Sequence, residues 1–235
     1  MTTAFLPCRA GSERVPRKNT RPFAGHAYGL VGIKLCQLAE AASIERIVLS
    51  TNDSEVIDIA ESLVAVRDKL VVDRRPEELC RSSTSTDELV RYVPTVVDTG
   101  TVLWTHVTSP MVSGRDYDSI VSAYDSAVAS GEADSLMTVN RFQEFLWDAR
   151  GPVNYDRTVE KWPRTQTLDP LFTVNSAAFV IDAGLMADRG DRVGVAPHLY
   201  ELEGVKGFDI DWEDQFEIAE LIFSRELERR LSSAP

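Results

Sequence analysis

The sequence predicts an α/β protein with one mainly parallel, doubly wound sheet, and two observations support this prediction. Short apolar runs of strand length alternate with segments of helical length and periodicity along most of the chain. The chain has 235 residues, of which 43% are hydrophobic and 26% are charged, which is ordinary for a globular protein with one large core. We therefore expect a single domain over residues 1–235, with helices covering both faces of the sheet.

The expected strands are short and apolar. Ile47-Val48-Leu49 is a continuous apolar run, which is typical of a parallel strand buried on both faces. Residues 101–107 form the clearest candidate for the central strand. In chain order, the expected strands are residues 3–8, 44–50, 70–72, 101–107, 135–139 and 177–181.

Amphipathic segments between these strands predict helices. Leu30, Ile33 and Leu38 are candidate core positions of the first helix, and Phe216 and Phe223 belong to one apolar stripe of a long last helix. In chain order, the expected helices are residues 29–42, 54–63, 86–97 and 114–130, and a last helix that begins near residue 213.

The alternation of strands and helices breaks between residues 140 and 172. Trp147, Tyr155, Trp162 and Phe172 stand there among charged residues and prolines, without clean periodicity. We therefore interpret residues 140–172 as an insertion in the domain that serves as a lid or as a dimerisation arm.

The overall charge and composition exclude several classes of function. The chain carries 25 Lys and Arg against 37 Asp and Glu, and this net charge of −12 argues against non-specific binding of nucleic acid. No apolar stretch approaches the ~20 residues that cross a bilayer, and the N-terminus does not resemble a signal peptide. We expect a cytoplasmic protein with no membrane partner. Cys8, Cys36 and Cys80 are widely spaced, so we expect reduced thiols and not a zinc site.

One segment is basic, although the chain as a whole is acidic. Residues 9–21 follow the first expected strand and contain five basic residues against one acid, Glu13. Backbone N–H groups of residues 10–12 can face phosphate oxygens, while Arg9 and Lys18 can neutralise the phosphate charge. The loop matches neither G-x-x-x-x-G-K-[ST] nor G-x-G-x-x-G, so a P-loop ATPase and a dinucleotide-binding Rossmann protein are not indicated. A solvated basic loop without a ligand is the alternative interpretation.

Three polar segments are expected to meet at one edge of the sheet. Ligands of open parallel sheets bind outside the carboxyl ends of the strands. Residues 9–19, 50–53 and 108–110 each follow an expected strand directly. The sequence therefore predicts a pocket at this edge.

Asp209 and Asp211 form a second candidate site. Alternate residues of an extended segment point to the same side, so we expect both carboxylates to face one way. A Mg²⁺ ion held by these carboxylates and by substrate phosphates would relieve their repulsion. The alternative is a pair of acids at the N-terminus of the last helix, where negative charge is favoured.

Five segments resemble, in order, the motifs of the acylneuraminate (CMP-sialic acid synthetase) cytidylyltransferase family. Residues 7–19 read PCRAGSERVPRKN and resemble the family pattern A-R-G-G-S-K-G-I-P-R-K-N. The other four are S-T-N-D at 50–53, R-P-E-E-L at 75–79, T-S-P at 108–110, and D-I-D with the following D-Q-F and A-E at 209–220. The resemblance covers nearly the whole chain. It implies a Rossmann-like nucleotidyltransferase sheet and a CTP-dependent transfer of CMP to a small acid, with release of pyrophosphate.

The resemblance also implies roles for individual residues. It implies that Arg9, Lys18 and Asp211 are catalytic, with Asp211 also able to act as a general base. It implies a Mg²⁺ cofactor bound by Asp209 and Asp211, and a homodimer. The residues that it implies for nucleotide binding are Arg9, Ala10, Gly11, Ser12, Lys18, Asn19, Arg75, Thr84, Ser85 and Thr86.

Residues that bind the acceptor are expected in two places. His106 stands where the family commonly has glutamine just before T-S-P, and a histidine buried in the core is the alternative. Lys161, Arg164 and Gln166 lie in the insertion, where the family has an R-x-Q that reaches the acceptor, in some members across a dimer interface. The fork of Arg164 suits a carboxylate or a phosphonate, although an arginine in this position can also be a solvated rim residue.

Departures from the family pattern leave the acceptor open. Glu13 replaces a lysine, Ser176 a glycine and Cys8 an alanine. The changes at positions 13, 106 and 176 favour slightly a non-sialic acceptor, and both a nonulosonic (sialic-type) sugar acid and a small phosphonate such as phosphonoformate stay open. Two other functions are alternatives: a sugar-1-phosphate nucleotidyltransferase using UTP or GTP, whose usual G-x-G-x-R loop is absent, and a non-catalytic nucleotide-binding regulator.

Overall fold

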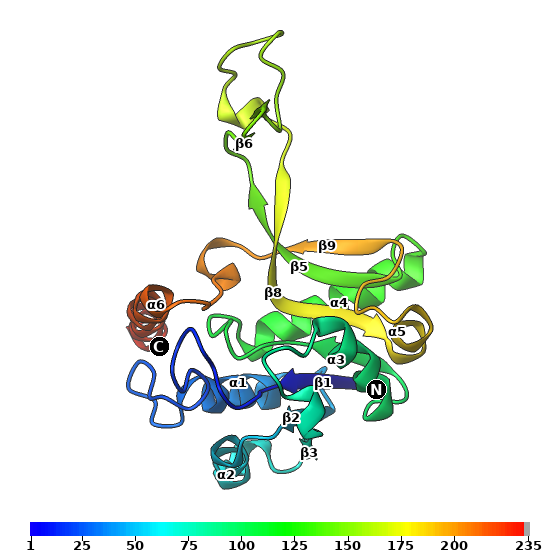
Figure 1. Cartoon of the computed structure of the whole chain (residues 1–235), viewed down its shortest axis with the longest axis vertical. Helices are drawn as coiled ribbons and strands as arrows, with labels where there is room; N and C mark the ends of the chain where they lie inside the picture. Colours follow the sequence, from blue (N-terminus) through cyan, green and yellow to red (C-terminus); the bar gives the residue numbers. More distant parts are fainter. Residues whose placement is uncertain (233–235) are drawn as a thin grey trace.

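A seven-stranded sheet forms the centre of the protein in a computed structural model that describes residues 1–232 (Figure 1). The strand order is β3-β2-β1-β4-β8-β5-β9. The strands are β1 (Thr2–Pro7), β2 (Arg46–Thr51), β3 (Leu70–Arg74), β4 (Thr101–Trp104), β5 (Ser135–Phe142), β8 (Leu171–Asp182) and β9 (Pro197–Glu201). The helices are α1 (Gly29–Glu40), α2 (Ser54–Ser62), α3 (Thr86–Tyr92), α4 (Gly114–Ser130), α5 (Ala183–Arg189) and α6 (Glu213–Ser232).

The sheet is mainly parallel, which confirms the predicted fold class. Strand β1 pairs in parallel with β2 and β4, β2 with β3, and β5 with β9. Only β8, among the described strands of this sheet, runs antiparallel to its neighbours β4 and β5. Its register places Phe179 opposite Trp104 on β4, and a bulge opposite Thr138 accommodates Ser176, whose φ of 58° is left-handed.

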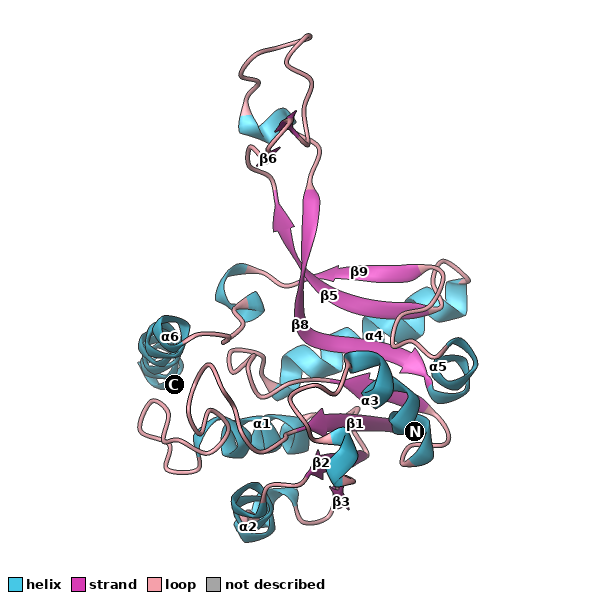
Figure 2. Ribbon diagram, in the orientation of Figure 1, coloured by secondary structure: helices cyan, strands magenta, loops and turns pink. Residues whose placement is uncertain are grey.

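Helices cover both faces of the sheet, as predicted (Figure 2). On one face, Leu35 of α1, Tyr117 of α4 and Phe216 of α6 belong to one continuous core. On the other face, Val90 of α3 and Met186 of α5 belong to a second core. No helix in the described residues is both long and apolar enough to cross a membrane.

The structure differs from the sequence-based expectations in several places. Helix α3 ends at Tyr92 and continues as a 3₁₀ turn, because Pro94 lacks the N–H that a longer α-helix needs. The central strand β4 ends at Trp104, three residues before the predicted end. Helix α5 and strand β9 were not predicted.

Residues 143–170 project far from the sheet (Figure 1). They are carried by the outer halves of β5 and β8, which leave the sheet as a two-stranded ribbon, and they contain the short hairpin of β6 (Trp147–Asp148) and β7 (Gly151–Pro152). Trp147 and Trp162 stack with ring centroids 6.4 Å apart and remain about half exposed. We call residues 143–170 the arm. Its role as a lid or dimer arm remains a prediction.

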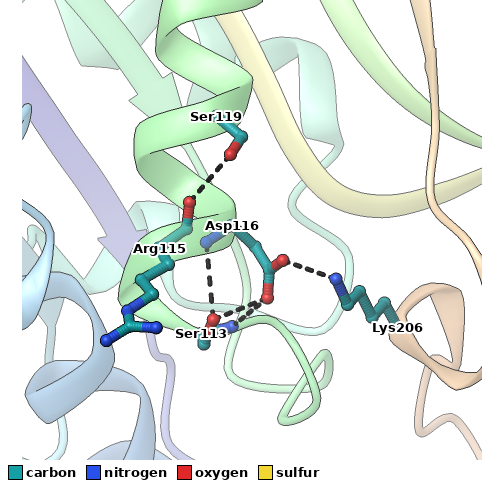
Figure 3. Close-up of polar contacts among 5 residues, drawn as sticks. All are labelled: Ser113, Arg115, Asp116, Ser119 and Lys206. Atoms are coloured by element: carbon teal, nitrogen blue, oxygen red, sulfur yellow. Dashed lines mark hydrogen bonds and ion pairs between the residues drawn. The ribbon is translucent and has the colours of Figure 1, made fainter.

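The 3₁₀ turn η5 (Gly204–Gly207) anchors the chain just before Asp209. Figure 3 shows Lys206 of η5 reaching Asp116 of α4, and the Nζ–Oδ1 distance is 2.7 Å. Asp116 also forms a capping box with Ser113 at the start of α4, because each side chain binds the other's backbone N–H. A Cβ on Gly207 would collide with the side-chain amide of Asn140, so a larger residue would displace the side chain that donates to the Gly207 carbonyl. These contacts fix where the acidic segment begins.

Candidate active site

A cavity of about 360 Å³ lies at the carboxyl edge of the parallel strands, where the sequence predicts a pocket. Its walls come from two segments, the basic loop that follows β1 and the residues that follow β4. The lining residues are Pro7, Cys8, Arg9, Ser12, Glu13, Arg14, Lys18, Asn19, His106, Val107 and Thr108. The structure thus brings Arg9, Ser12, Lys18, Asn19 and His106 of the predicted site together in one pocket.

Hydrogen bonds hold the start of the basic loop in place. The backbone N–H of Ala10 donates to Asn52 Oδ1 at 3.0 Å, and Asn19 Nδ2 donates to the carbonyl of Arg9 at 3.2 Å. Gly11 takes a left-handed φ of 74°, which glycine adopts without a steric cost. The Arg9 guanidinium turns back on its own loop and donates to the carbonyl of Gly11 at 3.1 Å. The loop is therefore shaped before any ligand binds.

The basic loop contacts the acidic segment directly. Lys18 Nζ donates to the carbonyl of Ile210 at 2.9 Å, and Arg14 Nη2 lies 2.9 Å from Asp211 Oδ1. Burial lowers the pKa of Lys18, while the charges of Asp211 and Asp209 act in the opposite direction. Segments almost two hundred residues apart in sequence therefore form one charged site.

Thr108 positions Asp209. The carbonyl of Thr108 accepts a hydrogen bond from the N–H of Ile210 at 3.1 Å, and the Thr108 side chain is hydrogen-bonded to the Asp209 carboxylate. Burial raises the pKa of Asp209 above its ordinary value, and the charge of Asp211 adds to this effect. Thr108 and Lys18 oppose the rise only in part. A further cation beside Asp209 would therefore stabilise its ionised form.

The two carboxylates fit a magnesium ion that is completed by phosphate oxygens. The charge of Asp211 helps to raise the pKa of Asp209, and a cation beside these two carboxylates would relieve this repulsion. No group of three or more His, Cys, Asp or Glu side chains in the described chain is arranged to hold a metal. Mg²⁺ commonly takes one or two carboxylates and completes its shell with water and phosphates. Magnesium remains a prediction on these grounds.

His106 is held as a neutral ring with a known tautomer. Trp104 Nε1 donates to His106 Nε2 at 3.0 Å, so Nε2 is the acceptor and the proton lies on Nδ1. Burial, aided by the charges of Arg192, Lys18 and Lys34, lowers the pKa of His106 to about 3. At neutral pH the ring therefore offers a single N–H donor and no charge.

The remaining predicted nucleotide residues lie outside the lining of this cavity. Arg75 is buried, and its Nη2 donates to the carbonyl of Ser50 at 2.7 Å, the same carbonyl that accepts the N–H of Cys8. Its Nε has no hydrogen-bond partner among the described residues. Ser85 caps the N-terminus of α3 in a capping box, and Thr84 Oγ1 donates to the carbonyl of Glu78, so both hydroxyls have structural partners. Thr86 is the first residue of α3 and is exposed.

Three predicted acceptor residues are not brought to this pocket. Lys161, Arg164 and Gln166 are exposed on the arm, which projects from the body of the same chain (Figure 1). Gln166 lies in the 3₁₀ turn Thr165–Thr167, and its carbonyl accepts a hydrogen bond from Gln143 at 3.3 Å.

Several residues of the site were not among those predicted from the sequence. Arg14 pairs with Asp211, Asn52 holds the loop, and Trp104 fixes the tautomer of His106. Asn52 and Thr108 lie in motifs that directly follow strands. This position at the sheet edge indicated that both residues would lie near the pocket. The pairing of Arg14 had no sequence signal.

A second, larger cavity of about 890 Å³ lies between α1, α6 and η5. It is lined by residues such as Ile33, Met111, Val205 and Phe223, and none of the predicted site residues reaches it. Because its walls lack the cluster of cations that a triphosphate requires, we place the candidate active site in the smaller pocket.

Parts of the chain are similar to curated proteins. In Legionella pneumophila, CMP-N,N'-diacetyllegionaminic acid synthase is 39% identical over 57 residues, which cover 24% of this chain and 24% of the relative. In Campylobacter jejuni, pseudaminic acid cytidylyltransferase is 36% identical over 73 residues, which cover 29% of this chain and 31% of the relative. Each match spans less than a third of the relative's length.

The fold is shared with solved structures. The structure of CMP:2-keto-3-deoxy-manno-octonic acid synthetase complexed with CTP has a TM-score of 0.68 at 14% identity, over 96% of this chain and 99% of that chain. At this identity the likeness supports the fold alone. The family model described as "Cytidylyltransferase" matches residues 3–161, more than half of the sequence and the part that contains the basic loop and Thr108. The chain belongs to the cytidylyltransferase family.

Proposed function

We propose that this protein is an enzyme that transfers CMP from CTP to a small acidic acceptor and releases pyrophosphate. One observation carries the proposal: in a chain of the cytidylyltransferase family, Lys18 and Arg14 of the basic loop meet the Asp209–Asp211 segment at the edge of one pocket. Cations beside a triphosphate stabilise the charge that develops on departing pyrophosphate, and such stabilisation is often the largest catalytic term.

The residues of the pocket have separate roles in this reaction. Lys18 and Arg9 bind the phosphates, and the backbone N–H groups of Gly11 and Ser12 supply further donors, while that of Ala10 is held by Asn52. Asp209 and Asp211 would hold Mg²⁺, which supplies charge neutralisation at the phosphates when bound. His106 donates its Nδ1–H to the nucleotide or to the acceptor. The neutral ring does not act as a base, because its pKa lies near 3.

The acceptor belongs to one of two classes of acid. The names of the two curated relatives, both synthases of CMP-linked nonulosonic acids, support a sugar acid. The serine at position 176 and the histidine at position 106 depart from the sialic-acid pattern and leave a small phosphonate in consideration.

A pyrophosphate-release assay tests the proposal. Wild-type protein is incubated with magnesium and each of CTP, UTP, GTP and ATP, against N-acetylneuraminic acid, a legionaminic-type sugar acid and phosphonoformate. We expect release with CTP and one class of acid. A preference for UTP or GTP with a sugar 1-phosphate would replace the proposal, and binding of CTP without turnover for any acid would favour a regulator.

We propose further that the protein acts as a homodimer whose arm reaches the partner's pocket. The arm exposes Trp147, Trp162 and Val159, apolar side chains that a partner surface would cover, and it carries Lys161 and Arg164 away from their own pocket. The test mixes Lys18→Ala and Arg164→Ala at an acceptor concentration far below the raised KM of Arg164→Ala, so that each variant alone has little activity. If one protomer supplies Lys18 and the other Arg164 to the same site, mixed dimers regain up to about a quarter of wild-type activity. Mixtures without any recovery would contradict the shared site.

A further inference from the structure

Arg192 lies across the aromatic residues that support His106. It belongs to the segment between α5 and β9, and its guanidinium carbon is 3.8 Å from the ring centroid of Phe179 and 5.1 Å from that of Trp104. Phe179 and Trp104 are register partners on the adjacent strands β8 and β4. The guanidinium therefore lies over two aromatic rings on the face of the sheet that carries α3 and α5.

The guanidinium has no hydrogen-bond acceptor within residues 1–232. Neither a hydrogen bond nor an ion pair joins its side chain to another described residue. Burial lowers the pKa of Arg192, and the neighbouring Asp191 offsets this effect only in part. Stacking on Phe179 satisfies the face of the guanidinium but leaves the N–H groups at its edge without partners. None of these nitrogens is completely buried, so an anion that arrives from solvent can accept hydrogen bonds from them.

The backbone around Arg192 is fixed, so the side chain starts from a defined position. Helix α5 ends at Gly190, which takes the left-handed conformation of a C-cap. The N–H of Val193 donates to Asp191 Oδ1 at 3.2 Å, and the N–H of Gly194 donates to Ser135 Oγ at 2.8 Å. The Arg192 side chain keeps part of its surface exposed and is reachable from solvent.

Arg192 and His106 are linked through the same tryptophan. Trp104 lies beside Arg192 and donates from Nε1 to His106 Nε2, which leaves the Nδ1–H of His106 available. The Trp104 and His106 ring centroids are 6.1 Å apart, and the charge of Arg192 acts on His106. His106 lines the pocket that also holds Lys18. Arg192 is not among the residues that line this pocket, so an acceptor bound at the His106 donor would have to extend past the pocket wall to meet the Arg192 fork.

We propose that Arg192 is a specificity-determining residue that binds an anionic group of the acceptor, a carboxylate or a phosphonate, beside His106. The proposal rests on the transfer of CMP to an acid and adds which residue of this chain recognises that acid. Arginine suits the role because its planar fork can bind either anion with two parallel hydrogen bonds while its face remains stacked on Phe179.

The experiment compares wild-type protein with Arg192→Gln, Arg192→Lys and the matched control Arg189→Gln. Arg189 lies three residues earlier at the exposed end of α5, so its change removes the same charge from the same region. We expect Arg192→Gln to raise the KM of the acceptor at least tenfold with the KM of CTP changed less than twofold. Arg192→Lys should recover part of the loss, and Arg189→Gln should match wild type. Equal acceptor KM values for Arg192→Gln and Arg189→Gln would overturn the proposal.

Two acceptor probes distinguish the source of the anion. N-acetylneuraminic acid presents a carboxylate, and 2-hydroxyethylphosphonate presents a phosphonate. The probe whose KM depends on Arg192 identifies the group that the fork binds. A KM for CTP that rises as much as that of the acceptor would instead place Arg192 among the nucleotide contacts and contradict the assignment.

A binding measurement separates this inference from the proposed reaction. Titration calorimetry with acetate and with methylphosphonate, in the absence of CTP, measures anion binding without turnover. If no acid supports CMP transfer but one anion binds wild type at least fivefold more tightly than Arg192→Gln, the proposed function fails and the anion site stands. If wild type and Arg192→Gln bind both anions equally, the anion site is wrong. Thermal unfolding of each variant shows whether the stack on Phe179 has been lost.

Discussion

Lys34 should make the stability of this protein rise with pH above neutrality. Its side chain on α1 is completely buried, and Nζ donates to the carbonyl of Ser109 at 2.8 Å and to Tyr117 Oη at 2.7 Å. Burial lowers the pKa of Lys34 from 10.5 to about 7, and Asp116 opposes the shift only in part. The folded chain therefore binds this proton much more weakly than the unfolded chain does.

The sign of the effect follows from proton binding. Between about pH 7 and pH 10 the unfolded chain holds the proton on Lys34 and the folded chain does not, so the free energy of unfolding rises with pH. One pKa unit corresponds to about 1.4 kcal/mol, and the shift predicts a gain of roughly 3 kcal/mol between pH 7 and pH 10. Below pH 7 both states are increasingly protonated and the slope disappears.

The two hydrogen bonds of Lys34 do not depend on its charge. A neutral amine still has two N–H groups for Ser109 and Tyr117. Thr105 Oγ1 donates its only hydrogen to the carbonyl of Ala177, so the Tyr117 hydroxyl must donate to Thr105 and accept from Lys34. This chain of donors stays complete after deprotonation, and only the cost of burying the charge changes with pH.

The assay is urea unfolding of wild type and of Lys34→Met at pH 7, 8, 9 and 10. Other groups titrate equally in both proteins, so the difference between their unfolding free energies isolates Lys34. We expect this difference to shift by roughly 3 kcal/mol in favour of wild type from pH 7 to pH 10. The absolute offset also contains the lost hydrogen bonds to Ser109 and Tyr117, which do not vary with pH. A difference that stays constant across this range would refute the reasoning.

A second variant tests the charge that opposes the pKa shift of Lys34. Asp116 is the carboxylate whose charge acts on Lys34, but it also pairs with Lys206 (Figure 3). Lys206→Met removes the competing cation and leaves more of the Asp116 charge to act on Lys34. The pKa of Lys34 should then rise, and the pH-dependent gain should move to higher pH. An unchanged pH dependence in this variant would show that Asp116 does not contribute.

Three further predictions concern the site and the sheet. Lys18→Ala should lower kcat about 10²-fold or more with an unchanged unfolding midpoint, measured by pyrophosphate release and urea unfolding; near-normal turnover would remove Lys18 from the mechanism. Arg164→Ala should raise the KM of the acceptor more than that of CTP, and equal changes would exclude an acceptor contact. Ser176→Gly should raise the unfolding free energy by about 0.5–1 kcal/mol, because Ser176 has a left-handed φ of 58°; a loss of stability would mean that the Ser176 side chain is needed.

The sequence predicted the part of the fold that depends on local patterns. The run Ile47-Val48-Leu49 lies in β2, and residues 114–130 form α4 with the predicted bounds. The pocket at the sheet edge was also predictable, because parallel strands place their carboxyl ends side by side and the loops that follow them must meet there.

Elements with weak local patterns were not predicted. Strand β9 lies at the edge of the sheet, begins with Pro197 and has no fully buried residue, so its apolar periodicity is faint. Helix α5 has only seven residues. The outer half of β8 is largely exposed, because it leaves the sheet to carry the arm, and an exposed strand has no buried face to mark it.

The charged residues of the site can be identified from the sequence, but their contact partners cannot, because those partners lie in distant segments. Five cations near residue 18 indicate an anionic ligand, but in the folded chain Arg14 and Lys18 already contact Asp211 and the Ile210 carbonyl. Both partners of the Arg14–Asp211 pair are about half exposed, and such pairs contribute about 1 kcal/mol or less. A triphosphate can therefore displace this pair at small cost. In the proposed reaction, this displacement would free Arg14 to bind phosphate and Asp211 to bind a metal ion.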